Sequence, residues 1–407
     1  MNPIKAFLKS FVINLQPGEK SIFSSESLTG VYVNEETALS NVTVYACIRL
    51  LSETLASLPL VVYKRNGKGK IRATEHPLYT LLHNQPNPEM NSLTLRETLM
   101  SHLLTWGNAY AQIDWEDYTH IKALWPLFPN RVRKTRDPQT KQIIYHYTPS
   151  DGSHPVDLPA WRVLHIPGLG FDGLVGYAPI TMARNTIGLA QATEEFGSRF
   201  FKNGINPSGI LEHPSKMSDT AYKNLKESFT NQYAGLGNSN KPIILEEGAK
   251  FNKISVSPED AQFLETRKFQ RSEIASFYHV PPHMIGDLER STNNNIEQQS
   301  LEFVIYTMRP WLVRWEQAIN TQLLTEDERS DYFAEFLVEG LLRGSPVTRA
   351  SFYKELFYLG ALSPNDIREK ENLDPITDPG GDKYYVQANM VPMDMAGKVP
   401  VVNPVNK

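Results

Sequence analysis

The clearest hydrophobic pattern lies between residues 257 and 324, where two stretches of helical periodicity flank a polar run. Ser257-Pro258-Glu259-Asp260 is a helix start, because serine caps the free N–H groups, proline suits the first turn and carboxylates favour the positive end of the helix dipole. Val280-Pro281-Pro282 must end this helix near His279, since proline has no N–H and disfavours a helical predecessor. The face predicted to be buried comprises Phe263, Leu264, Ile274, Phe277 and Tyr278.

The second stretch, Ile296 to Leu324, has apolar residues at helical spacing, and the run Gly286–Asn295 before it is almost wholly polar. Pro310 is expected to kink this helix. Two long helices that carry a polar loop indicate a mechanical role more than a catalytic one. The apolar positions predicted to face a core are Leu301, Ile305, Met308, Trp311, Leu312, Trp315, Ile319 and Leu323.

Residues 41–165 have the pattern of one α+β body. A helix is predicted from about Asn41 to Leu58, capped by Asn41 or Ser40 and closed by Pro59. A strand at Leu60–Tyr63 turns at Asn66-Gly67. Further predicted elements are a short helix at His76–Leu82, another helix that starts at Ser92, and the strand segments YAQIDW, IIYHY and RVLHI.

The next helix candidate is Gly176 to Gly204, beginning near Pro179. Gly188 and Gly197 inside it indicate a bend or the close approach of a neighbouring element, since each costs about 1 kcal/mol relative to alanine. Residues 205–256 read as a small αβ unit with a strand (SGILE), a helix from Ser218 to Tyr233 and two further strands (PIILEE, KFNKIS). Downstream, the sequence predicts a strand at Tyr332–Val338, a helical hairpin over Thr348–Leu359 and Pro364–Asn372, and an extended or disordered end.

Composition excludes several functions. The chain has 407 residues, 21% of them charged, and a net charge of −4, which argues against tight wrapping of nucleic acid. The single Cys47 excludes internal disulfides and cysteine-rich zinc sites. The sequence has no apolar run of about 18 residues, so no membrane span is predicted. The first residues lack the continuous apolar region of a signal peptide.

One motif resembles a nucleotide site. Gly168-x-Gly170-x-x-Gly173 follows the strand-like Val163–Ile166 and precedes a helix, as a dinucleotide fingerprint does. The helix starts only after Gly176, however, and no acidic residue ends a second strand about 20 positions on. A flexible hinge is the favoured interpretation, and a nucleotide-binding enzyme is an alternative.

Histidines and acidic clusters give no metal site. His279 and His283 have i,i+4 spacing, but the prolines between them prevent a shared helical face. Acidic pairs such as Glu246-Glu247 and Glu194-Glu195 are typical of solvated faces. Trp311 and Trp315, at helical spacing, indicate packing in a core or between subunits. We therefore expect no metal, no cofactor and no catalytic residue.

The order of these segments resembles tailed-bacteriophage portal proteins over about residues 30–375. No single segment is a chemical signature, and the specificity comes from their order. The segments are NVTVYACIRLLSETLASLPLVVYKR, LTLRETLMSHLLTWGNAYAQI, GLVGYAPITMARNTIGLAQATEEFGSRFFKNGINPSGIL, FYHVPPHMIGD, NNNIEQQSLEFVIYTMRPWLVRWEQAIN and LGALSPNDIREKENLDPI.

The resemblance implies an α+β, multidomain portal subunit with long stem helices, a small αβ clip, an α+β wing and a short helical crown. The implied parts are an N-terminal arm (1–40), the first part of the wing (41–175), a stem helix (176–204), the clip (205–256), a second stem helix (257–280), the tunnel-loop region (281–295), the long helix with the second part of the wing (296–345), the crown (346–375) and a flexible tail (376–407).

The resemblance also implies a function. The chain would form a ring of about twelve copies at one capsid vertex, assembled in the host cytoplasm and kept in the virion, as the channel for DNA packaging and ejection. Its partners would be the terminase large subunit, the capsid protein, a head-tail adaptor and double-stranded DNA passing without sequence preference, with no membrane. A non-ring structural adaptor is the other alternative. The implied site residues are the clip residues Glu246 and Glu247, for partner docking, and the channel-loop residues Asp287, Leu288, Glu289, Arg290, Ser291, Thr292, Asn293, Asn294 and Asn295.

Overall fold

The computed structural model describes residues 26–67, 69–117, 120–203, 209–212, 218–220, 222–223, 227, 250–253, 259–287, 299–338, 346–371 and 373–386. The chain divides into two compact units, Met1–Leu337 and Val338–Lys407.

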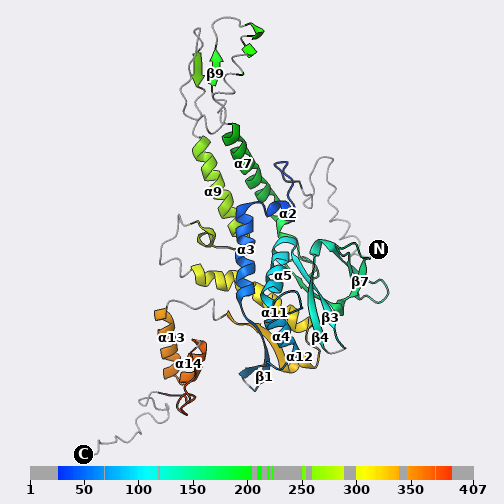
Figure 1. Cartoon of the computed structure of the whole chain (residues 1–407), viewed down its shortest axis with the longest axis vertical. Helices are drawn as coiled ribbons and strands as arrows, with labels where there is room; N and C mark the ends of the chain where they lie inside the picture. The colour runs from blue at the N-terminus through cyan, green and yellow to red at the C-terminus, as the bar shows by residue number, and fades with distance from the viewer. Residues whose placement is uncertain are drawn as a thin grey trace, which may run out of the picture. The chain divides into compact units, whose positions relative to one another are not determined.

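Two packed helices form the centre of the first unit (Figure 1). Helix α3 (Val42–Ser57) begins where the Asn41 side chain accepts hydrogen bonds from the backbone N–H groups of Thr43 and Val44, so Asn41 and not Ser40 is its cap. Helix α5 (Ser92–Trp106) packs beside it. The apolar face predicted for α3 is buried, as periodicity requires. The short helix α2 (Glu35–Ala38) precedes α3 in the sequence, and the short helix α4 (Pro77–His83) lies between α3 and α5.

Three small antiparallel sheets complete the body. In the first, β1 (Leu60–Asn66) lies between β2 (Gly69–Arg72) and β11 (Tyr332–Phe336), with Leu60 opposite Phe336. This pairing joins the two sequence halves of the unit. The second sheet has the order β4 (Ile121–Leu127), β3 (Asn108–Trp115), β8 (Val163–Pro167), and the third has the order β5 (Val132–Arg136), β6 (Ile143–Tyr147), β7 (Val156–Pro159).

The buried Arg96 side chain binds carbonyl groups at the C-terminal ends of α3 and α4. The Arg96 guanidinium donates to the carbonyl of Ala56 at 2.7 Å and to that of Leu82 at 2.9 Å, near the ends of α3 and α4. Helix C-terminal carbonyls lack intrahelical partners, so a buried cation there satisfies them. Burial lowers the pKa of Arg96 to about 10.

The helix predicted from Pro179 is interrupted. Helix α6 (Pro179–Met182) ends in a turn at Ala183, and α7 (Arg184–Asn203) follows. Of the two explanations offered for Gly188, close approach is confirmed, because a Cβ there would clash with the Ser27 side chain. Helix α9 (Glu259–Phe277) lies alongside α7 (Figure 1).

Between α7 and α9 in the sequence lie the strands predicted at SGILE and KFNKIS, β9 (Gly209–Glu212) and β10 (Lys250–Lys253), and they pair antiparallel. The strand predicted at PIILEE, and most of the helix predicted from Ser218 to Tyr233, lie outside the described residues.

The second long helix contains a π-helical segment, Phe303–Met308, directly before α11 (Arg309–Gln322). Its last turn has the Arg309 N–H donating to the Val304 carbonyl, five residues back. A kink was predicted at Pro310, and the structure places a wider, π-helical turn directly before it, with Pro310 as the second residue of α11. Leu301 and Ile305, predicted to be buried, are 42% and 41% exposed, whereas Met308, Leu312, Trp315, Ile319 and Leu323 are buried.

The strand predicted after this helix is β11, preceded by the short helix α12 (Glu328–Asp331). The 3₁₀ turns η1 (Pro129–Arg131) and η2 (Ala160–Arg162) lead into β5 and β8.

The second unit contains the predicted helical hairpin, α13 (Pro346–Tyr358) and α14 (Pro364–Lys370). Ser363 and Asp366 form a capping box at the start of α14. Residues 376–386, part of the end expected to be extended or disordered, contact this hairpin. Val386 pairs with Leu359, and the Tyr385 ring stacks on Phe357 at 5.5 Å. Apolar side chains in this short segment supply that contact. Residues 387–407 lie outside the described part of the chain.

Candidate functional site at the start of the polar loop

Helix α9 ends in a Schellman motif that turns the chain toward the predicted loop. The N–H of Val280 donates to the Ala275 carbonyl at 2.8 Å, and the N–H of His279 donates to the Ser276 carbonyl at 3.0 Å. His279 has φ +55°, the left-handed position usually taken by glycine. A histidine there carries strain of about 1–2 kcal/mol. The pattern Val280-Pro281-Pro282 thus ends the helix as predicted.

A second turn of the same kind follows at once. The 3₁₀ turn η4 (Pro282–Ile285) closes on Gly286, which has φ +84°. The Asp287 N–H donates to the Pro282 carbonyl at 3.0 Å. Asp287, the first predicted channel-loop residue, is therefore held by the body. Leu288 to Asn295, the remaining predicted loop residues, lie outside the described residues.

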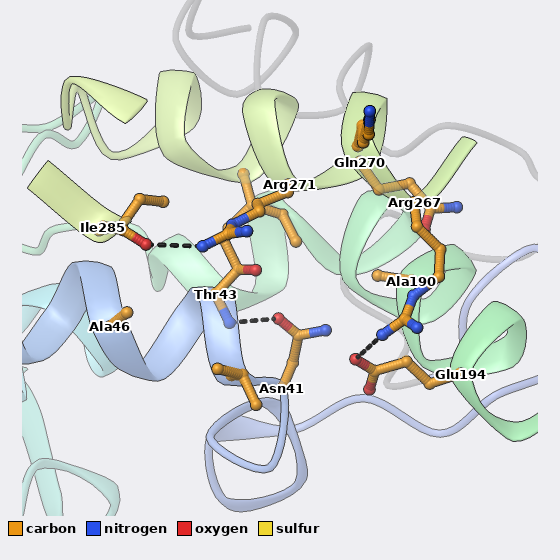
Figure 2. Close-up of a pocket in the computed structure, with 12 residues that line it drawn as sticks. Asn41, Thr43, Ala46, Ala190, Glu194, Arg267, Gln270, Arg271 and Ile285 are labelled. Atoms are coloured by element: carbon orange, nitrogen blue, oxygen red, sulfur yellow. Dashed lines mark hydrogen bonds and ion pairs between the residues drawn. The ribbon is translucent and has the colours of Figure 1, made fainter. Parts of the chain in front are cut away.

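Arg271 holds this turn against α9. Its Nη2 donates to the Ile285 carbonyl at 2.7 Å (Figure 2). Both groups line a cavity of about 370 Å³ at the junction of α3, α7, α9 and η4, together with Arg267, Lys268 and Glu194. The Arg271 guanidinium therefore binds a main-chain carbonyl of the turn.

The helical segment that follows the polar run contacts the end of α9 as well. Gln299 begins the next described helical stretch, and Thr307 within it donates its hydroxyl to the His279 carbonyl at 2.6 Å. Tyr278 donates to the Leu104 carbonyl of α5 at 3.3 Å, and burial raises the pKa of its phenol well above the ordinary value. The chain segments on both sides of the polar run are thereby anchored to one small region of the body.

Weaker contacts join α7 to α9. The Gln270 side chain donates to the Thr193 hydroxyl at 3.2 Å, and Arg267 pairs with Glu194 at 3.4 Å (Figure 2). The ion pair is half exposed, so it contributes at most about 1 kcal/mol. The predicted docking residues Glu246 and Glu247 belong to the part of the chain that the structure does not describe.

Two glycines of the motif, Gly168 and Gly170, lie where stretches of backbone pack closely, whereas Gly173 is in open space. A Cβ on Gly168 would lie 2.7 Å from the Gly107 carbonyl oxygen, and one on Gly170 would overlap the Val175 carbonyl. The N–H of Gly168 donates to the Gly107 carbonyl at 2.7 Å. The glycines allow two stretches of backbone to touch, so neither a hinge nor a nucleotide is required to explain them.

Side chains close the same loop. Asp172 accepts hydrogen bonds from the N–H groups of Leu174 and Val175, which lower the pKa of its carboxyl group. Asn108 accepts from the Gly176 N–H at 2.9 Å and donates to the Gly176 carbonyl at 2.8 Å. A dinucleotide fingerprint offers free N–H groups to a pyrophosphate. In this loop the N–H groups of Gly168, Leu174, Val175 and Gly176 already donate within the protein.

The buried histidines are structural. His165 shares hydrogen bonds with Asn108 at 3.1 Å and Tyr145 at 3.2 Å. Burial, with a smaller effect of Lys134, lowers the pKa of His165 to about 3. Burial lowers the pKa of His102 to about 4. Among the described residues, no group of three or more histidine, cysteine or acidic side chains is arranged to hold a metal ion.

Sequence reasoning missed two residues, Arg271 and Thr307. Both bind main-chain carbonyls, and a carbonyl acceptor leaves no trace in the sequence. The contact of Arg271 could be suspected only from its place about three turns before the Pro-Pro corner. In the described part of the chain, no helix is long and apolar enough to cross a bilayer.

Comparisons with known proteins agree with this architecture. Residues 42–372 match the phage portal protein family. The chain is 35% identical over 369 residues to the portal protein of Enterobacteria phage HK97, covering 90% of this chain and 86% of that protein. It is 34% identical over 392 residues to the probable portal protein of Streptomyces phage phiC31, covering 92% and 84%.

A solved structure gives a similar fold. A chain in the neck of a native GTA particle computed with C12 symmetry superposes with a TM-score of 0.59 at 20% identity, covering 87% of this chain and 97% of that one. With the family matched over most of its length, this chain belongs to the phage portal protein family.

Proposed function

We propose that this chain is the portal subunit of a phage head, forming a ring of about twelve copies whose channel passes DNA during packaging and ejection. The single observation that carries the channel assignment is the double anchoring of the polar run. Arg271 holds the Ile285 carbonyl and Thr307 holds the His279 carbonyl, so the described segments before the run, up to Asp287, and after it, from Gln299, are both attached near the end of α9. The C12 symmetry of the GTA neck supports the ring.

The composition of the loop supports weak contact with DNA and not tight binding. Asp287 to Asn295 contains one aspartate, one glutamate and one arginine, Arg290, and no aromatic residue. Tight binding to phosphates needs several cations, and sequence readout needs paired contacts to base edges. A loop with one cation would touch passing DNA briefly and equally at every sequence. Its proposed role is steric, as a collar that narrows the channel.

The test is a loop deletion in assembled heads. Residues 288–295 are replaced by two glycines, with Asp287 kept because its N–H closes the η4 turn. A matched control replaces the exposed turn Gln139–Lys141, between β5 and β6, with two glycines. We expect the loop variant to form rings but to package or retain less DNA, while the control behaves as the wild type. Normal packaging and retention by the loop variant would refute the collar.

Docking of the terminase large subunit and the head-tail adaptor is assigned to the clip, residues 205–256. Glu246 and Glu247 are its adjacent acidic pair. Reversing both charges to lysine should weaken partner binding without changing ring mass. A control with lysine at Glu326 and Asp327, also adjacent acids, should bind partners normally. If only the control pair affects binding, the clip assignment fails.

The remaining contacts follow from the proposed vertex location. The wing would contact the capsid protein, and assembly in the host cytoplasm would precede retention in the virion. A non-ring adaptor is the competing structural role, and native mass measurement separates the two. A stable monomer of 46.2 kDa at micromolar concentration would count against the portal ring.

A further inference from the structure

An apolar groove lies on the first unit beside the loop anchors. It has a volume of about 500 Å³ and runs between the end of α5, the glycine loop, α6, the end of α9 and the start of α11. Its lining is dominated by large apolar and aromatic side chains, among them Leu169, Met182, Phe277, Tyr306 and Trp311. Arg314 is the one arginine or lysine in this lining, and it donates to the Pro167 carbonyl at 2.7 Å.

The rim of this groove is unusually exposed for such residues. Phe171, close to Leu169 in the glycine loop, is 88% exposed, Leu169 is 80% exposed and Tyr306 is 71% exposed. Isolated apolar residues are common on surfaces, but a continuous apolar patch marks an interaction site. Aromatic, methionine and arginine side chains with few other charges are the composition of an interface core.

The helix that forms one wall carries apolar side chains on two opposite sides. Its inner side buries Phe303, Val304, Met308 and Leu312, which explains how it packs on the body. Its outer side exposes Leu301, Ile305, Tyr306 and Val313 by 41–71%. A helix that is hydrophobic on both sides is stable when both are covered. Within the described part of the chain, only the inner side is covered.

We propose that the groove and the outer face of this helix are covered by a second copy of this chain. The inference rests on the ring proposed above and names the surface through which it closes. In a closed ring the contacts are heterologous, so each copy offers this groove to a different patch of its neighbour, and every groove is filled. Nucleic acid is a poor occupant, because the Arg314 guanidinium in the groove already binds a carbonyl.

The first test places a charge on the exposed rim. Tyr306→Glu changes a side chain that is mostly in solvent in the single chain, so the subunit fold should be kept, as circular dichroism would verify. The matched control is Ile71→Glu on β2, a side chain 52% exposed and outside the groove. Native mass should fall from about twelve subunits to 46.2 kDa for Tyr306→Glu and stay unchanged for Ile71→Glu.

The outcomes separate this inference from the proposed function. A wild-type protein that is itself monomeric refutes the ring. A wild-type ring with an equally stable Tyr306→Glu ring overturns the groove assignment and leaves the ring standing.

A labelling experiment gives a second measurement of whether the groove is covered. The introduced thiol of Met182→Cys, on the groove wall, is treated with a maleimide in the native ring. Background is low because Cys47 is buried and its pKa is raised to about 12. We expect at least tenfold slower labelling in the ring than in Met182→Cys subunits dissociated by Tyr306→Glu. Equal rates would overturn the proposal. Protection that disappears on deletion of residues 1–25, at unchanged ring mass, would assign the groove to the N-terminal arm instead.

Discussion

Replacing Arg271 by methionine should loosen the start of the polar loop. Methionine keeps much of the aliphatic stem but cannot donate to the Ile285 carbonyl, which Arg271 reaches at 2.7 Å. A hydrogen bond from a charged donor contributes about 1.5–3 kcal/mol. Taking about 2 kcal/mol, the population of the opened turn should rise about 30-fold, since each 1.4 kcal/mol is about a factor of ten.

The assay is native-state amide hydrogen exchange at the turn itself. The N–H groups of Gly286 and Asp287 donate to the carbonyls of His283 and Pro282, so they exchange only when η4 opens. Their exchange should accelerate by about the same factor of 30, while amides in the middle of α3 keep their wild-type rates.

The same helix offers a matched control. Arg267→Met makes the identical chemical change one turn earlier, at an ion pair whose side chains are 50% and 38% exposed. Solvent screening limits that pair to at most about 1 kcal/mol, and it does not touch η4. Exchange at Gly286 and Asp287 should stay near the wild-type rate in this variant. If both variants leave these amides unchanged, or accelerate them equally, the anchoring role of Arg271 is refuted.

Three further outcomes follow from backbone strain and buried charge. His279→Gly removes left-handed strain at the end of α9 and should raise the unfolding free energy by about 1 kcal/mol in urea titrations; a loss would show that the ring of His279 contributes more than its backbone costs. Gly107→Ala adds a clash with the Tyr177 carbonyl to the strain of φ +73°, so it should lower the unfolding free energy by about 3 kcal/mol or more. Gly152→Ala, at φ +83° in open space, should lower it by only about 1 kcal/mol. Similar losses in the two variants would contradict the packing argument. Burial lowers the pKa of His102 to about 4 and that of His165 to about 3 in the folded protein. In the unfolded chain each histidine has its ordinary pKa near 6.5, so below that pH the unfolded chain binds more protons than the folded one. The unfolding free energy should therefore fall by about 2 kcal/mol per histidine between pH 7 and pH 5. His102→Gln should remove its share of that slope, and an unchanged slope would refute this origin.

The sequence by itself determined the elements whose signals are local. Asn41 caps α3, the Pro-Pro corner after Val280 ends α9, and Ser363 with Asp366 starts α14, because capping and proline effects act within about four residues. The order of the six sequence segments over about residues 30–375 was enough to indicate the portal family, which the matched residues 42–372 confirm. The break at Ala183 and the π-helical segment before Pro310 were not predicted. One irregular turn changes the spacing of apolar residues too little to be recognised in a helical pattern of period 3.6.

Only the tertiary structure decided how the loop is held and what stays uncovered. Arg271 and Ile285 are 14 residues apart, and His279 and Thr307 are 28 apart, with main-chain carbonyls as the acceptors. A carbonyl is present at every position, so no sequence pattern distinguishes the one that is bound. The same holds for Leu301 and Ile305: periodicity marks them as apolar, but burial depends on which surface faces them. Within the described part of one chain that surface is solvent, and its proposed cover comes from a neighbouring subunit.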